Sequence, residues 1–111
     1  MKLLTETAKK EIVQHMIRSL LPVHILRLIQ LQPLWGYKIK KEVETKFGVK
    51  LRHGALYPLL NILERDGFVA SQEQQQGLRK RKVYMITKKG NEYLETYRMI
   101  LKDQLCDGDI R

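Results

Sequence analysis

The feature that most constrains the fold is a short amphipathic helix pattern followed directly by a basic β-hairpin pattern. At 100° per residue, the helix predicted over residues 52–65 gathers apolar side chains on one face, at Leu56, Leu59, Leu60 and Leu63. The opposite face carries groups that can reach DNA bases and phosphates, at Tyr57, Asn61 and Arg65, with His53 near the border. After a turn at Asp66-Gly67, strands are predicted over residues 68–73 and 82–86, around a polar tip at 74–78.

The excess positive charge is concentrated in two short segments. The net charge is +9, from 21 basic and 12 acidic residues. Residues 36–54 carry six basic and two acidic residues, and residues 79–89 carry six basic residues and no acidic one. The remainder, with nine basic and ten acidic residues, is nearly neutral. Such clustering is typical of a nucleic-acid-binding surface, whereas a generally basic soluble protein would spread its charge more evenly.

Periodicity predicts four more helices, over residues 6–18, 20–31, 36–47 and 88–105. Ser19 is expected to cap the second helix, because Pro22 is tolerated only in a first helical turn. Gly48 is expected to end the third helix. The alternation of Val49 and Leu51 predicts one short strand.

This order of elements, together with three motifs, resembles the PadR-like family of transcriptional regulators over about residues 18–105. The motifs are the Gly36-Tyr37 pair, the segment GALYPLL with LERDGFV at 54–69, and YMITKKG at 84–90. The resemblance implies a winged-helix fold, a homodimer joined through the terminal helices and repression by operator binding. It also implies that some relatives release DNA when a small-molecule effector binds.

The predicted fold class is mainly α with a small β-hairpin. It is a winged helix-turn-helix with an extra N-terminal helix and a long C-terminal dimerisation helix. The expected division is an N-terminal helical extension at 1–18, a winged-helix DNA-binding domain at 19–87, and a C-terminal dimerisation helix and tail at 88–111.

The residues predicted to contact double-stranded DNA lie at the start of two helices and in the wing. Gly54 allows close approach of the duplex, Tyr57 is the candidate for phosphate and Asn61 the candidate for a base. Ala55 stands where the family commonly has threonine, and Arg52 and His53 stand where a small cap residue is more usual. Helix capping and DNA contact are therefore expected to differ here. The full set is Tyr37, Lys38, Arg52, His53, Gly54, Tyr57, Asn61, Arg79, Lys80, Arg81 and Lys82.

The last helix, with Thr87 as its predicted cap, carries an apolar stripe that the three-helix core cannot cover completely. The stripe consists of Tyr93, Leu94, Tyr97, Ile100, Leu101 and Leu105. Pairing with a second copy across a two-fold axis would bury it, with Ile12, Met16 and Leu20 as further candidates. The alternative is that the helix folds back on its own domain.

No catalytic residue, cofactor or metal is expected. The sequence lacks GxGxxG, HExxH and any recognisable nucleophile-and-base motif. His15 and His24 are nine residues apart, a spacing that on one helix would put them on opposite faces, so they do not form a metal pair. Cys106 with Asp107 and Asp109 could hold a metal, but a frayed carboxyl end is favoured.

A winged helix that binds another protein is the alternative to a DNA-binding one. Concentrated wing charge argues against it, because a protein-docking wing would expose apolar residues. Trp35 is expected to fill the core beside Pro33 rather than stack on a planar drug. At 111 residues the chain is one domain, and its single cysteine excludes an internal disulfide. The charge-free stretches are too short to span a bilayer, and the sequence has no signal-peptide pattern. We therefore expect a cytoplasmic protein with no membrane partner.

Overall fold

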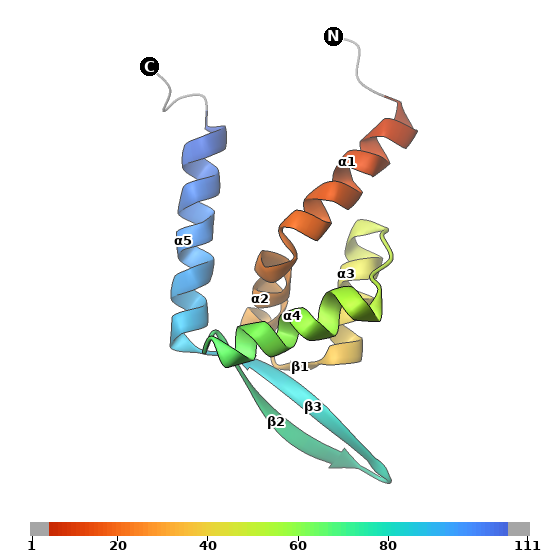
Figure 1. Cartoon of the computed structure of the whole chain (residues 1–111), viewed down its shortest axis with the longest axis vertical. Helices are drawn as coiled ribbons and strands as arrows, with labels where there is room; N and C mark the ends of the chain where they lie inside the picture. Colours follow the sequence, from red (N-terminus) through yellow and green to blue (C-terminus); the bar gives the residue numbers. More distant parts are fainter. Residues whose placement is uncertain (1–4, 107–111) are drawn as a thin grey trace.

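The computed structural model describes residues 5–106. In chain order its elements are α1 (Glu6–Ser19), α2 (Leu21–Leu31), β1 (Leu34–Trp35), α3 (Gly36–Phe47), α4 (His53–Arg65), β2 (Val69–Gln76), β3 (Arg79–Ile86) and α5 (Lys88–Leu105) (Figure 1). The described residues thus form five helices and a three-stranded antiparallel sheet. The predicted winged helix-turn-helix, with an added helix at each end, is confirmed.

The core lies between α2, α3 and α4 and is closed by the first half of α5. Leu56 and Leu60 of α4 are completely buried, and Leu63 is nearly so, while Leu59 is half-buried at the edge. They pack with Ile25, Leu26, Ile39, Val43 and Leu94. The leucine stripe predicted from periodicity is therefore the face by which α4 is anchored, which leaves its opposite face free.

The hairpin formed by β2 and β3, here called the wing, is longer than predicted. The two strands pair in antiparallel register from Val69 opposite Ile86 to Gln76 opposite Arg79. The predicted polar tip at 74–78 is therefore wrong: its glutamines belong to β2, and Gly77 turns the chain with a φ of 61°. Because both faces of the outer wing are exposed, its sequence has no period-2 pattern that would indicate a strand.

The predicted strand at Val49 and Leu51 is also wrong. Both side chains are buried, but they lie in a loop whose Leu51 N–H donates to the Glu44 carboxylate at 2.8 Å. The third strand is instead β1, which pairs with β3 through Leu34 opposite Tyr84 and Trp35 opposite Val83. The alternation at 49–51 therefore reflects two anchor points of a loop and not a ladder.

Thr5, Thr87 and Gly48 mark helix ends. Thr5 and Thr87 accept backbone N–H bonds at the starts of α1 and α5, and Gly48 ends α3 in the left-handed conformation. The predicted Thr87 cap and Gly48 stop are confirmed. Ser19, however, ends α1 and does not cap α2, whose first turn has no side-chain cap.

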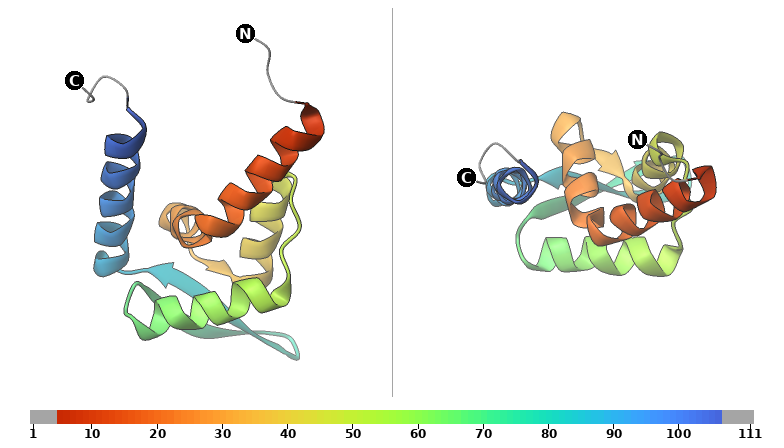
Figure 2. Two further views of the ribbon diagram at one scale, coloured as in Figure 1. Left: turned by 45° about the horizontal axis from the view of Figure 1, so that its top comes forward. Right: turned by 90° about the horizontal axis from the view of Figure 1, so that it is seen from above.

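The two terminal helices project from the same side of the molecule. The elements α2, β1, α3 and α4 are here called the body, and the wing extends from it, with its tip on the side opposite to the free ends of α1 and α5 (Figures 1 and 2). A bend of 73° separates α1 from α2. In residues 5–106 no single helix is long and apolar enough to cross a membrane, and only α1 and α2 counted together reach that length and composition.

Candidate DNA-binding interface

The start of α4 has backbone groups that no side chain of the described chain caps. Arg52 occupies the N-cap position, and Arg52, His53 and Gly54 are all exposed. A Cβ built on Gly54 would have no atom of the chain within 4 Å, so packing within this fold does not require a glycine there. Free N–H groups and the positive end of the helix dipole give this end the properties of a phosphate-binding site.

Tyr57 belongs to α4, the candidate recognition helix, and its ring lies against the start of α3. A Cβ on Gly36 would lie 2.7 Å from Cε1 of Tyr57, so glycine is needed there for the phenol ring to lie against α3. Tyr57 is half-buried and packs partly on the core, and the ring of His53 lies 5.6 Å away. Asn61, by contrast, is exposed one turn further along α4. The two candidates therefore differ in freedom: Tyr57 is fixed, and Asn61 can adjust.

At the start of α3, Tyr37 and Lys38 are exposed next to α4. The ring of Tyr37 lies 5.2 Å from that of Trp35, and Lys38 pairs with Glu42 at 3.2 Å. This pair is solvent-exposed and weak, so the Lys38 ammonium can exchange Glu42 for another anion.

The four basic wing residues have different surroundings. The Arg81 guanidinium lies 3.8 Å from the centre of the Trp35 ring, and its Nε is buried without a hydrogen-bond partner in the described part of the chain. Trp35 is half-buried in β1, so the expectation that it fills the core is wrong. Arg79 and Lys80 are exposed.

Lys82 is tied to the recognition helix. Its ammonium lies 3.1 Å from the Glu64 carboxylate, which also accepts a bond from Ser71. The bonds from Ser71 and then from Lys82 lower the pKa of Glu64, and the bond to Glu64 raises the pKa of Lys82. Arg79 and Lys80 are therefore the wing charges without an ion-pair partner in the described residues, whereas Arg81 contacts Trp35 and Lys82 pairs with Glu64.

A shallow hollow of about 240 Å³ brings many of the predicted residues together. It is lined by Tyr37, Tyr57 and the wing residues Arg79, Lys80, Arg81 and Lys82, with Trp35 and Tyr84. Asn61, Arg52 and His53 do not line it and lie along α4 instead. Sequence reasoning missed Trp35 and Glu64 as partners of the wing. The only local signal was the alternation along β3, which places the consecutive residues Arg81 and Lys82 on opposite faces of the strand.

Some residues of the apolar stripe of α5 are buried against their own chain, and others are exposed to solvent. Leu94 is completely buried in the core, so its prediction as a dimer contact is wrong. The cause is Gly90, where a side chain would collide with the carbonyl of Phe68, so α5 starts close against β2. Tyr93 and Tyr97 are half-buried beside Phe68. Exposed apolar side chains begin further along, at Met99, Ile100 and Leu105, and α1 exposes Ile12 and Met16.

The described part of the chain shows no metal site. Residues 5–106 contain no group of three histidine, cysteine or carboxylate side chains placed to hold a metal ion. Cys106 is half-buried, and the Asp107 and Asp109 of the alternative considered above lie outside the described residues.

Comparison with known proteins connects this geometry to regulators. The model of the transcriptional regulator PadR-like family matches residues 25–96. A PadR family transcriptional regulator from Eggerthella lenta is 30% identical, with 92% of each chain covered and a TM-score of 0.73. A PadR-like transcriptional regulator from Bacillus cereus is 28% identical, with 77% of this chain and 84% of that chain covered and a TM-score of 0.68.

The structure of Bacillus subtilis PadR in complex with operator DNA is also similar. It is 28% identical, with 70% of this chain and 45% of that chain covered and a TM-score of 0.65. A search of curated proteins gave no significant match.

Proposed function

This chain belongs to the PadR-like family of transcriptional regulators, which bind DNA and are not enzymes, and we propose that it represses transcription as a homodimer on an operator. In this proposal α4 enters the major groove, while the wing lies over the neighbouring backbone or minor groove. The complex of the Bacillus subtilis relative with operator DNA supports an operator as the binding partner.

The observation that carries the proposal is the polar face of α4 beside the free charges of the wing. Leucines anchor one face of α4 in the core, and the opposite face presents Asn61 and the uncapped first turn. Arg79 and Lys80 extend from the wing with no ion-pair partner in the described residues. A duplex held between α4 and the wing would meet phosphate-binding groups on both sides of a base-reading group.

Individual roles follow from how firmly each side chain is held. Tyr57, fixed against Gly36, suits a phosphate, whose position does not change with sequence. Asn61, exposed and free to rotate, can offer a donor and an acceptor to an adenine edge. Arg52, His53, Tyr37 and Lys38 are assigned to the flanking backbone.

The dimer is proposed from the exposed apolar side chains of the terminal helices. Met99 is 65% exposed, Ile100 47% and Leu105 73%, and on α1 Ile12 and Met16 are each 48% exposed. Because α1 and α5 project from the same side, a second copy could cover both sets at once (Figure 1). The wing would remain free for DNA.

Footprinting of the purified protein on DNA selected from random duplexes, followed by transcription in vitro from a promoter overlapping that site, tests the proposal. We expect a two-fold symmetric footprint and loss of transcript. A footprint with increased transcript would refute repression alone, and failure to select any sequence would refute specific binding.

A further inference from the structure

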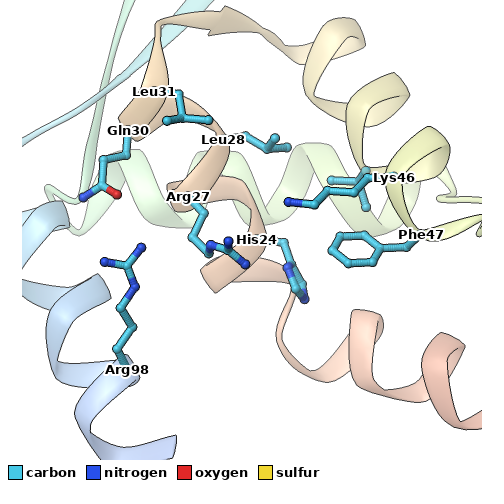
Figure 3. A pocket seen from close by; sticks show the side chains of 9 residues that line it. His24, Arg27, Leu28, Gln30, Leu31, Lys46, Phe47 and Arg98 are labelled. Carbon is cyan, nitrogen blue, oxygen red and sulfur yellow. The ribbon is translucent and has the colours of Figure 1, made fainter. Parts of the chain in front are cut away.

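A second concentration of positive charge lies away from the recognition helix. Side chains of α2, α3 and α5 enclose a pocket of about 110 Å³, and α4 lies behind α2 in this view (Figure 3). Arg27 comes from α2, Lys46 from α3 and Arg98 from α5, with His24 beside them (Figure 3). None of these residues belongs to the DNA-binding set proposed above.

Arg27, Lys46 and Arg98 all line this pocket, and within the described part of the chain only Arg98 has an acidic partner. In residues 5–106 neither Arg27 nor Lys46 forms an ion pair, and Arg98 pairs only with Glu95 on its own helix, at 2.5 Å. Burial, then the charge of Arg27 and then that of Lys46 lower the pKa of His24. Arg27, Lys46 and Arg98 are all exposed, so solvent screens much of their mutual repulsion, and a bound anion would remove the remainder.

The other walls leave the cationic groups free to act as donors. The ring of Phe47 lies 4.7 Å from His24, and the Lys46 ammonium is 5.6 Å from the centre of the Phe47 ring. The Gln30 amide is already bonded to Asn91 at 2.9 Å. The volume is roughly that of three or four water molecules, so it suits a group of phosphate size.

We propose that this pocket binds a phosphate group, carried either by a small metabolite or by inorganic phosphate. Arg27 and Arg98 donate to its oxygens and Lys46 closes the third side. Guanidinium groups match tetrahedral oxyanions by paired N–H donors, which favours phosphate over a halide.

Regulation follows from the position of Arg98 and rests on the proposed function. Arg98 lies on α5, the helix that carries the exposed apolar stripe, whereas Arg27 and Lys46 belong to the body. A phosphate shared by both parts fixes the angle between α5 and the body. In a homodimer that angle sets the distance between the two recognition helices, so phosphate binding alters DNA affinity.

Calorimetric titration of the full chain with inorganic phosphate and with phenyl phosphate, at constant ionic strength set by NaCl, tests the pocket. We expect saturable binding of at least one probe, one per chain, and the tighter probe identifies the carrier. Arg27→Gln should weaken binding roughly tenfold or more. Lys102→Gln, the same charge change on exposed α5 surface, should leave it unchanged. Circular dichroism checks that both variants fold.

Equal, non-saturating responses of the wild type, Arg27→Gln and Lys102→Gln would overturn the proposal. It would also be overturned if no probe bound and Arg27→Gln weakened self-association, because a carboxylate of the second copy would then occupy the pocket. Duplex affinity, measured separately with and without the probe, should change in the wild type and not in Arg98→Gln. A chain that binds phosphate but no duplex would contradict the proposed function and leave the pocket standing.

Discussion

At the scale of single residues, α4 offers two hydrogen-bonding side chains that differ in how freely they can move. Tyr57 is held by Gly36 and half-buried, whereas Asn61 is exposed. A fixed hydroxyl can position the protein on any duplex, and a free amide can distinguish one base from another. The two substitutions below should therefore differ in kind.

Asn61→Ala should cost roughly 1–3 kcal/mol on a selected site and little on a scrambled duplex, because it removes a base contact. Tyr57→Phe keeps the ring against Gly36 and should weaken binding to both duplexes about equally. Fluorescence anisotropy titrations of both variants on both duplexes make the comparison. Equal losses for Asn61→Ala on the two duplexes would remove it from the base-reading role.

His24 should make stability depend on pH near neutrality. Burial, Arg27 and Lys46 lower its pKa in the folded chain below the usual 6.5, so the unfolded chain binds more protons as the pH falls past that value. Stability present above pH 6.5 is therefore lost on acidification. When the pH is lowered from about 7.5 to about 5.5, the melting temperature should fall further for the wild type than for His24→Gln. Parallel falls in the two proteins would show that His24 does not titrate this way.

At the scale of elements, the wing contacts other elements about midway along its length and is free at its end. Arg81 stacks on Trp35 of β1, and Lys82 pairs with Glu64 of α4, while residues 72–80 are all exposed. We expect the Arg81–Trp35 contact, together with the exposed Lys82–Glu64 pair, to help orient Arg79 and Lys80 toward a duplex. Arg81 and Lys82, which the sequence predicts as DNA contacts, therefore also contact other elements of their own chain.

Arg81→Lys should weaken DNA binding although it keeps the charge, because a lysine ammonium does not stack as a planar guanidinium does. The free energy of unfolding should fall by about 0.5–1 kcal/mol. Lys102→Arg, an exposed exchange of the same two residue types outside the DNA-binding set, serves as the control and should change neither quantity. Urea unfolding and anisotropy measure both, and an Arg81→Lys variant that behaved as wild type would show that the stack does not orient the wing.

Sequence periodicity was sufficient for the helices and insufficient for the sheet. The leucines of α4 and the end signals at Gly48 and Thr87 are local, so they could be recognised in the sequence. β1 has two residues, too few for any period, and the glutamines of β2 face solvent on both sides. Such segments become strands only because they pair with the backbone of β3, which local sequence does not reveal.

The candidate interface was predictable in its residue types more than in its contacts. Arg81 meets a tryptophan far away in the chain, and nothing near either residue indicates that contact. The burial of Leu94 depends on how closely Gly90 lets α5 approach Phe68, which helical periodicity does not encode.

At the scale of the whole molecule, the exposed apolar residues of α5 lie in its second half, whereas the first half packs on the core of the same chain. Ile100→Asp should therefore give folded monomers that bind DNA poorly, because one recognition helix cannot reach two half-sites. Leu78→Asp, at the fully exposed wing tip, should leave the oligomeric state unchanged. Sedimentation of the three proteins decides, and a monomeric wild type at tens of micromolar would contradict the homodimer.

The salt dependence of duplex binding tests the central claim most directly, since it counts phosphate contacts, which we propose that α4 and the wing make. If a homodimer makes ~6–10 such contacts, the logarithm of the binding constant should fall against the logarithm of salt concentration with a slope of about −5 to −9. Half-sites should lie about one helical turn, ~34–36 Å, or a multiple of it apart. A slope near zero, or no duplex binding at low salt, would contradict the account.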